Sequence, residues 1–185
     1  MRVSKQQAAE NREAILTNAA RLFREKGVSG VGVDALAEAA GMTHGSLYSQ
    51  FGSKDQVLAE AMSHGFARTG EMAARMKTVA ESVTTYLSPA HRDNPGRGCF
   101  MAALGGDMPR QSEEVREAFT GIVKGNVARL ADKLPSGSPQ QRRDEILATV
   151  AAMVGALVLA RAVDDPALSD RILSATRAKL LKGAK

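Results

Sequence analysis

Two short helical segments joined by a tight turn constrain the fold of this chain more than any other sequence feature. Helical spacing predicts one segment over 33–40, and Leu47 and Phe51, four residues apart, point inward from a second. The connection between the two segments is Gly41-Met42-Thr43, in which the glycine ends the first helix and the threonine can cap the second. Helices this short are unstable alone, so the helix expected over 10–26 must hold them by packing. The pattern predicts a helix-turn-helix.

The remainder of the chain predicts further helices and no strand. Ser53 and Gln56 have the spacing of a capping box and open a long helix. The low aromatic content of 4% also favours helices over a β-sandwich or barrel. Glycine and proline clusters separate the later helices, which we expect over 71–88 (one helix or a kinked pair), 99–104, 111–134, 139–163 and 166–181.

These segments predict an all-α protein of two parts. The first is an N-terminal three-helix helix-turn-helix domain over 1–55. The second, over 56–185, is a C-terminal helical domain, to which the family resemblance given below assigns ligand binding and dimerisation.

The sequence carries no signal for secretion, membrane insertion or metal binding. Its first residues lack the apolar core of a signal peptide, and the longest uncharged stretch, 146–160, is too short and interrupted to span a bilayer. The single Cys99 excludes an intrachain disulfide and a multi-cysteine metal site. No His, Asp and Glu cluster has metal-ligand spacing, and no glycine-rich phosphate loop is present. We therefore expect a cytoplasmic protein with no metal, no cofactor and no membrane contact.

The helix expected after Thr43 presents a polar outward face without carboxylates. Such a face can approach a phosphate backbone closely, and the net charge of +5 leans toward an anionic partner. Lys54 falls in the first turn of the next helix, where backbone N–H groups and the helix dipole already favour an anion. The candidate DNA-binding residues are Thr43, His44, Gly45, Ser46, Tyr48, Ser49, Gln50 and Lys54.

The helix expected over 139–163 is apolar on nearly all sides and must therefore be buried on two faces. One face can pack within the chain and the other, with the last helix, against a second copy in a four-helix dimer interface. A helix-turn-helix contacts one DNA half-site about one turn from its mate, so a homodimer suits a palindromic operator. The alternative is the core helix of a monomer. The candidate interface residues are Met153, Val154, Leu157, Val158, Arg161, Ile172 and Leu173.

Methionine and aromatic side chains recur along the middle helices, where an adaptable apolar pocket or ordinary core packing would both use them. We expect a small apolar or amphipathic effector whose binding shifts the separation of the two recognition helices. The candidate pocket residues are Met62, Phe66, Tyr86, Cys99, Phe100, Met101, Leu104 and Phe119.

Cys99 has two interpretations. It follows a glycine-rich turn, begins a short helix and lies two residues from Arg97, features that favour a thiolate and suit an electrophile or oxidant sensor. The alternative is a small buried hydrophobic residue.

Two other functional classes compete with a DNA-binding regulator. His91, Asp93 and Cys99 could form a thiol hydrolase, but they flank a Pro-Gly turn and no oxyanion-hole motif accompanies them, so we expect no enzyme. Thiol-ester turnover that is lost in Cys99→Ala would indicate the hydrolase. A helical protein–protein adaptor would instead bind DNA weakly and without salt dependence.

The motif residues resemble those of the TetR/AcrR (tetracycline-repressor-like) transcriptional regulators. The resemblance is specific over 10–60 and only architectural over 60–185. It implies a regulator, by family tendency a repressor, that binds double-stranded DNA as a homodimer and responds to a ligand. The matching residues are Gly27, Leu36-Ala37-x-x-Ala40-Gly41-Met42-Thr43, Gly45-Ser46-Leu47-Tyr48-x-x-Phe51 and Ser53-Lys54.

The resemblance also implies individual roles. Thr43, Tyr48 and Lys54 fall at positions that usually touch DNA phosphate. Before the second helix such proteins usually carry two hydroxyl residues, where this chain has Val31-Gly32. Residues on or beside the base-reading face are His44, Ser46, Ser49 and Gln50.

Overall fold

The computed structural model describes residues 5–183, which form helices and contain no strand. Two short 3-10 helices, Pro95–Arg97 and Met108–Arg110, lie in the connections. The α-helices are α1 (Lys5–Lys26), α2 (Val33–Ala39), α3 (His44–Phe51), α4 (Lys54–Ala74), α5 (Val79–Tyr86), α6 (Pro89–Arg92), α7 (Phe100–Leu104), α8 (Glu113–Ala131), α9 (Pro139–Ala162) and α10 (Pro166–Gly183). The all-α class is confirmed.

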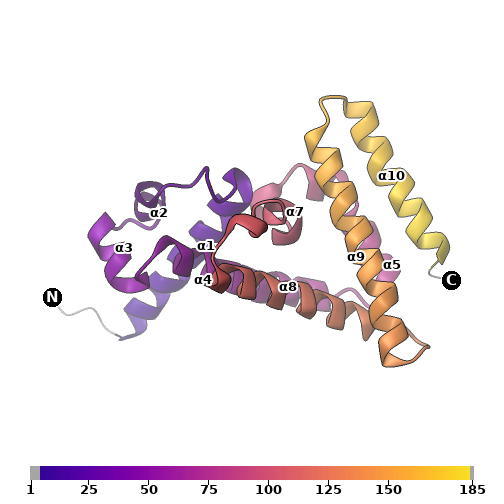
Figure 1. Cartoon of the computed structure of the whole chain (residues 1–185), viewed down its shortest axis with the longest axis horizontal. Coiled ribbons are helices and arrows are strands. Elements are labelled where there is room, and N and C mark those ends of the chain that lie inside the picture. The colour runs from indigo at the N-terminus through magenta and orange to yellow at the C-terminus, as the bar shows by residue number, and fades with distance from the viewer. Residues whose placement is uncertain (1–4, 184–185) are drawn as a thin grey trace.

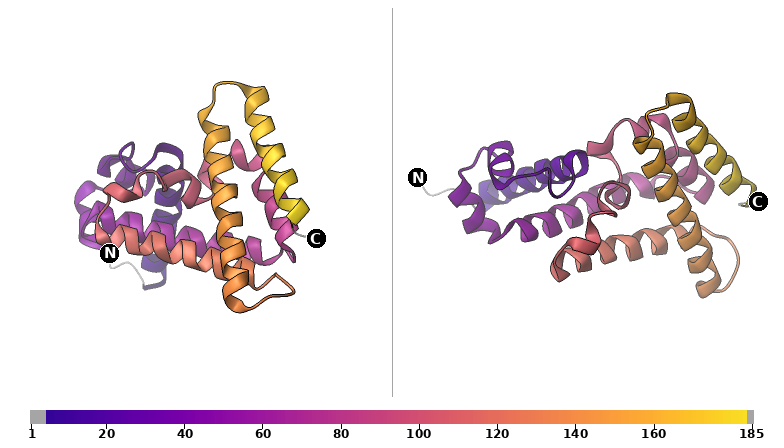
Figure 2. Two further views of the ribbon diagram at one scale, coloured as in Figure 1. Left: turned by 45° about the vertical axis from the view of Figure 1, so that its right-hand side comes forward. Right: turned by 45° about the horizontal axis from the view of Figure 1, so that its top comes forward.

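The helices form an elongated arrangement with different elements at its two ends (Figure 1). Helices α1, α2 and α3 lie at one end, and α9 and α10 lie side by side at the other, as both views in Figure 2 also show. The long helix α4 packs against both α1 and α8, and α8 packs against α9. Helix α4 therefore links the end that carries α3 to the rest of the molecule.

Most of the expected helices occur close to their predicted bounds, with two differences. Helix α1 begins at Lys5 rather than near residue 10, because the polar stretch before Glu10 consists of good helix formers such as Gln and Ala. The region 71–88 is divided between α4 and α5 by the connection 75–78, since Thr78 caps α5 by accepting a hydrogen bond from the Glu81 N–H.

Helix α9 is long and apolar enough, by length and composition alone, to cross a membrane. Its apolar residues have partners within the chain, because α9 packs against α7, α8 and α10. Of the residues expected at a dimer interface, Met153, Leu157 and Leu173 are buried in the core of the chain itself. Val158 and its neighbour Leu159 are exposed.

Candidate DNA-binding surface and effector cavity

Helix α3 is held from beneath by two buried side chains and one arginine from α1. Leu47 and Phe51 point into the core, as the four-residue spacing predicted. The Arg12 guanidinium lies 4.3 Å from the centre of the Phe51 ring and pairs with Glu60 on α4. Arg12 also donates to the Gln50 carbonyl at the end of α3. These contacts join α1, α3 and α4 into one support for the exposed face of α3.

Hydrogen bonds at the helix ends fix the turn between α2 and α3. The Thr43 hydroxyl caps α3 by accepting from the Ser46 N–H at 3.2 Å, which confirms the predicted cap. The Asn18 side chain, from α1, donates to the Ala39 carbonyl at 2.9 Å and so satisfies the end of α2. Gly32 stands at the N-cap of α2 and contributes no side-chain hydrogen bond.

The outward face of α3 carries an exposed histidine and tyrosine one turn apart. The His44 and Tyr48 rings are 5.1 Å apart, and 42% of the Tyr48 surface is exposed. Gly45, Ser49 and Gln50 are also exposed, while Ser46 is half-buried beside the Thr43 cap. This face offers hydroxyl, amide and imidazole groups to a partner.

An acidic side chain from α2 reaches this face, which the sequence pattern of α3 alone did not indicate. The Asp34 carboxylate lies 2.7 Å from Nδ1 of His44. Asp34 is almost fully exposed, so the pair can separate when a polyanion approaches. Asp34 and His44 are ten residues apart in the sequence, and the packing of α2 against α3 brings them together, so the sequence alone could not predict this contact.

Lys54 lies in the first turn of α4, and its ammonium group contacts the loop between α1 and α2. Its Nζ donates to the Val28 carbonyl at 2.7 Å. The Val28 N–H donates in turn to the Asp107 carboxylate at 3.2 Å. Lysine has three donors, so this hydrogen bond leaves two for another acceptor.

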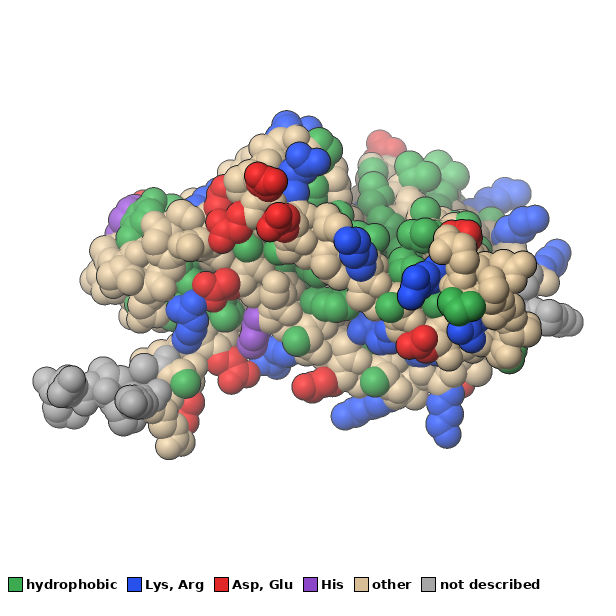
Figure 3. All heavy atoms as spheres, turned by 60° about the horizontal axis from the view of Figure 1, so that its bottom comes forward, with side chains coloured by type: hydrophobic (Ala, Val, Ile, Leu, Met, Phe, Trp, Pro, Cys, Tyr) green, Lys and Arg blue, Asp and Glu red, His purple; other side chains and the backbone are tan. Residues whose placement is uncertain are grey.

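The helix-turn-helix segment is poor in positive charge. Between Val31 and Ser53 the sequence has no Lys or Arg, and Asp34 and Glu38 are acidic. On the face shown in Figure 3, the end of the molecule that carries α3 presents mainly uncharged atoms, whereas charged side chains gather over the middle and the opposite end. Polar uncharged groups and the α3 N-terminus therefore dominate this surface.

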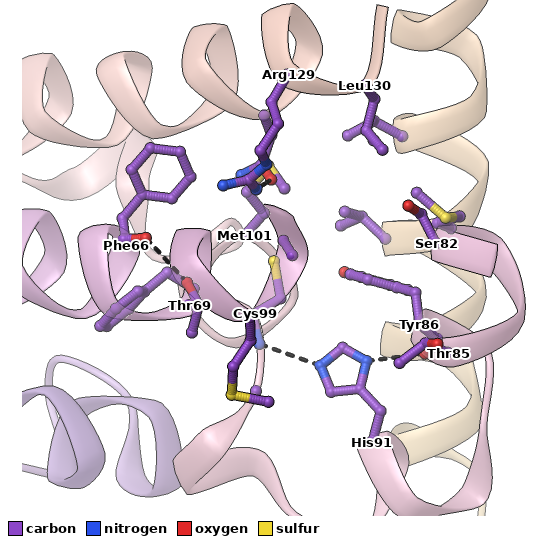
Figure 4. Close-up of a pocket in the computed structure, with 18 of the residues that line it drawn as sticks. Phe66, Thr69, Ser82, Thr85, Tyr86, His91, Cys99, Met101, Arg129 and Leu130 are labelled. Carbon is purple, nitrogen blue, oxygen red and sulfur yellow. Dashed lines mark hydrogen bonds between the residues drawn. The ribbon is translucent and has the colours of Figure 1, made fainter. Parts of the chain in front are cut away.

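A cavity of about 310 Å³ opens between α4, α5, α8 and α9. Of the candidate pocket residues, Phe66, Tyr86, Cys99, Phe100 and Met101 line it. They come from α4, α5 and the start of α7, as Figure 4 shows for Phe66, Tyr86, Cys99 and Met101. The other three do not line it. Met62 and Leu104 are fully buried in the core, and Phe119 is half-buried beside it, because their helix faces turn away from the opening.

His91 is fixed at the cavity wall as a neutral imidazole. Its Nδ1 lies 2.8 Å from the Tyr86 carbonyl, which can only accept, and its Nε2 accepts from the Cys99 N–H at 3.2 Å (Figure 4). Burial lowers the pKa of His91, more than its hydrogen bond to the Tyr86 carbonyl raises it. Both ring nitrogens are therefore occupied by backbone groups.

These bonds do not assemble the thiol hydrolase considered above. The His91 ring meets the Cys99 backbone and has no nitrogen left to take a proton from the thiol. The Asp93 carboxylate pairs with the neighbouring Arg92 instead of orienting the imidazole.

Two polar residues of the cavity are functional candidates that the sequence pattern did not reveal. Arg129 and Asn126 extend from α8, where their spacing is that of an ordinary solvated helix face. The Arg129 guanidinium lies 5.2 Å from the Phe66 ring centre and donates to the Asn126 side chain. Only the packing of α8 against α4 turns this polar face inward.

The geometry is that of a helix-turn-helix protein of the DNA-binding class. Buried side chains hold α3 against the core, the turn before it is capped, and its outer face is polar and exposed. Residues 15–61, which include all of α2 and α3, match the family described as bacterial regulatory proteins, tetR family. This match places the helix-turn-helix segment in that family.

Curated relatives and solved structures support this placement. A stretch of 71 residues, 38% of the chain, is 38% identical to the HTH-type transcriptional regulator AcrR of Shigella flexneri, and a stretch of 126 residues, 68% of the chain, is 38% identical to the HTH-type transcriptional repressor KstR2 of Mycolicibacterium smegmatis. The chain spans only 33% and 54% of the length of these two relatives.

Similar folds occur in solved regulator structures. The reduced form of Escherichia coli NemR has a TM-score of 0.77 at 21% identity, with 94% of this chain and 96% of that chain covered. A TetR-family regulator from Cytophaga hutchinsonii also has a TM-score of 0.77, at 20% identity and 100% and 98% coverage. These likenesses establish the shared fold.

Proposed function

We propose that this protein is a cytoplasmic, homodimeric transcriptional repressor whose DNA affinity responds to a small apolar or amphipathic effector. In this proposal residues 1–55 bind DNA and residues 56–185 bind the effector and the second protomer. The observation that carries the proposal is the exposed polar face of α3, set on a rigid buried support and matched by the tetR-family residues. An α-helix with such a face fits the major groove.

We assign each candidate residue to DNA phosphates or to base edges by its position on or beside α3. Thr43 and Tyr48, with Lys54 through its two remaining donors, contact phosphates and position the helix. His44, Ser46, Ser49 and Gln50 face or flank the base edges.

The dimer forms through the exposed faces of α9 and α10. Leu147, Val158 and Leu159 on α9 and Leu168 on α10 are exposed apolar side chains, and Ala151 and Gly155 lie between them on α9. Small residues there allow a second helix to approach closely. Of the residues expected from the sequence, Val158 is exposed on this face, whereas Val154 and Ile172 are half-buried against the core of the chain.

The remaining interface candidate, Arg161, already serves its own chain, because its guanidinium donates to the carbonyls of His91 and Arg92.

An effector in the cavity reaches the DNA-binding end through Arg24. The Arg24 guanidinium, from α1, donates to the Gly96 carbonyl at 2.9 Å and lies 4.4 Å from the centre of the Phe100 ring, which lines the cavity. Burial lowers the pKa of Arg24 to about 10, so the group stays charged at neutral pH. A ligand that displaces Phe100 moves the contact that anchors α1, which supports α3 through Arg12.

Selection of bound sequences from a random double-stranded DNA library, with the purified protein at physiological salt, tests the proposal. We expect enrichment of an inverted repeat with two half-sites about one helical turn apart. A folded protein that enriches no sequence in the presence or absence of cell-extract small molecules would contradict the regulator and favour a helical adaptor.

Variants of α3 separate positioning from base reading. Tyr48→Ala is expected to weaken binding to all sequences roughly tenfold, by loss of a charge-assisted phosphate contact. Substitution of His44 or Ser49 is expected to change the preferred bases instead. Unchanged base preference in both variants would defeat this division of roles.

The oligomeric state has its own test. Val158→Glu is expected to dissociate the dimer in sedimentation experiments, because it places a charge in an apolar interface. Thr120→Glu, at an exposed position of α8, is the matched control and is expected to remain dimeric.

Sensing through Cys99 is a second candidate, favoured by the position of this half-buried thiol in the cavity lining. If the thiol is the sensor, N-ethylmaleimide abolishes DNA binding by the wild type and leaves Cys99→Ser unaffected. Equal sensitivity of both proteins would exclude it.

A further inference from the structure

Two hydrogen-bond donors at the cavity are buried without an oxygen or nitrogen acceptor. They are the Tyr86 hydroxyl and Nε of Arg129. In Figure 4 both side chains extend toward the same space, Tyr86 from α5 and Arg129 from α8. Burial and the adjacent Cys99 thiol raise the pKa of Tyr86 well above its ordinary value, so its hydroxyl keeps its proton and remains a donor. Buried polar groups without a partner are rare and mark a place where one is expected.

Other polar side chains of the lining already bond within the fold. The Thr69, Ser82 and Ser88 hydroxyls donate to backbone carbonyls of their own or adjacent turns. The Asn126 amide donates to the Ile122 carbonyl, and its oxygen accepts from Arg129. These bonds use the hydroxyl and amide donors named above, and both nitrogens of His91 are occupied, whereas free donors remain at Tyr86 and Arg129. A bound group that accepts hydrogen bonds fits these two donors.

The charged side chains that line the cavity are positive, which also favours an anionic ligand. Arg97 and Arg129 both line the cavity, and its lining contains no Asp or Glu. Within residues 5–183, Arg129 forms no ion pair with a carboxylate. Partial burial lowers the pKa of Arg129, more than the nearby Cys99 raises it.

The rest of the lining is apolar and adaptable. Four methionines contribute, together with two phenylalanines and aliphatic residues of α8 and α9. Methionine side chains adjust to ligands of varied shape. The volume of about 310 Å³ falls at the lower end of the range for small-molecule pockets.

We propose that the cavity binds a small amphipathic carboxylate, with its anionic group facing Arg129 and Tyr86 and its apolar body against Phe66, Phe100 and the methionines. This inference rests on the proposed role of the cavity as the effector site, and it names the chemical class of the effector.

Calorimetric titration of the full chain with octanoate and with octanamide, a neutral compound of the same chain length, tests the assignment. We expect octanoate to bind roughly tenfold more tightly, the effect of one charge-assisted hydrogen bond. Arg129→Met keeps the apolar stem and is expected to remove this preference, whereas Arg129→Lys is expected to retain it. Arg116→Met, at an exposed position on the same helix, is the matched control and should behave as the wild type.

Every outcome of the titrations either supports or overturns the carboxylate site. Tighter or equal binding of octanamide, the absence of binding by octanoate, or an unchanged preference in a folded Arg129→Met variant would overturn it. Melting curves of each variant establish that it is folded. Addition of octanoate to the complex with the selected DNA then separates the two proposals: binding without any change in DNA affinity contradicts the effector response but leaves the carboxylate site intact.

Discussion

The molecule carries two tyrosine–histidine pairs, one on the exposed face of α3 and one at the cavity wall. On α3 the Tyr48 and His44 rings are 5.1 Å apart and exposed, and His44 meets the Asp34 carboxylate. At the cavity the Tyr86 and His91 rings meet edge to face at 4.5 Å and are largely buried, with His91 held by two backbone groups. The same residue types therefore occur in two opposite environments.

The two pairs differ in whether the tyrosine hydroxyl can form a hydrogen bond before a ligand or DNA is bound. On α3 the tyrosine is exposed to solvent, so binding exchanges one set of hydrogen bonds for another and specificity comes from geometry. In the cavity the Tyr86 hydroxyl is buried and has no oxygen or nitrogen partner. A ligand that supplies an acceptor there removes an existing penalty, which is why a small molecule can bind with few contacts.

The largest effect is expected beneath the exposed pair. Phe51→Ala removes a buried ring and the surface on which Arg12 lies, and is expected to lower the free energy of unfolding by about 3–5 kcal/mol. Urea denaturation measures this change. Tyr48→Ala, three residues away on the same helix, is expected to change stability by less than about 0.5 kcal/mol. Equal losses in the two variants would show that α3 has no distinct buried and exposed faces.

The two tyrosines are expected to respond differently to loss of the hydroxyl. Tyr86→Phe removes a buried donor without a partner, so the free energy of unfolding of the ligand-free protein is expected to rise by about 1 kcal/mol. Tyr48→Phe is expected to leave it unchanged. Ser169→Ala provides the opposite case: this buried hydroxyl donates to the Ala160 carbonyl at 2.6 Å, and its loss is expected to cost about 1 kcal/mol. Destabilisation by Tyr86→Phe would mean that its hydroxyl has a partner after all.

Stability is expected to depend on pH through His91. Since burial lowers the folded-state pKa of His91, the unfolded chain binds more protons below the ordinary histidine value of about 6.5. Stability is therefore complete above that pH and falls as the pH drops toward the folded-state pKa. Denaturation at pH 7.5 and 5.5 is expected to show a smaller loss in His91→Gln than in the wild type. A loss in His91→Gln equal to that of the wild type would assign the effect elsewhere, for example to His64, whose pKa burial also lowers.

The smallest effect is expected at the N-cap of α2. Gly32→Ser adds a hydroxyl where a side chain meets no atom within 4 Å, and is expected to stabilise the protein by a few tenths of a kcal/mol. Thermal melting measures the gain, and Gly32→Ala controls for backbone entropy. A gain that is equal in both variants would exclude capping as the cause.

The helical organisation could be predicted from the sequence because its signals are local. Thr43 and Ser53 cap α3 and α4 as expected, Asp165 accepts from two N–H groups at the start of α10, and Leu47 and Phe51 are buried. A kinked pair of helices over 71–88 was one of two expectations, but the break at 75–78 could not be located, because it contains no Gly or Pro and depends on the cap at Thr78.

The cavity could be predicted only in part, because its polar groups come together through tertiary packing. Methionine and aromatic content indicated an apolar pocket, yet it could not distinguish Met62, in the core, from Met101, in the lining. Arg129 has the sequence pattern of a solvated helix face. Its lack of a carboxylate partner is a property of three-dimensional neighbours, which no spacing rule reports.

The peptide at Val28 constrains how this regulator could be rebuilt. Its N–H is bonded to Asp107 and its carbonyl to Lys54, while Arg24, four residues earlier, is bonded to Gly96. A chimera that transplants residues 1–55 onto the body of another regulator severs the bonds to residues 96 and 107 while preserving every residue of α3. Such a hybrid would keep its operator preference but lose its response to the new ligand, unless the recipient supplies an acceptor at each of these two places.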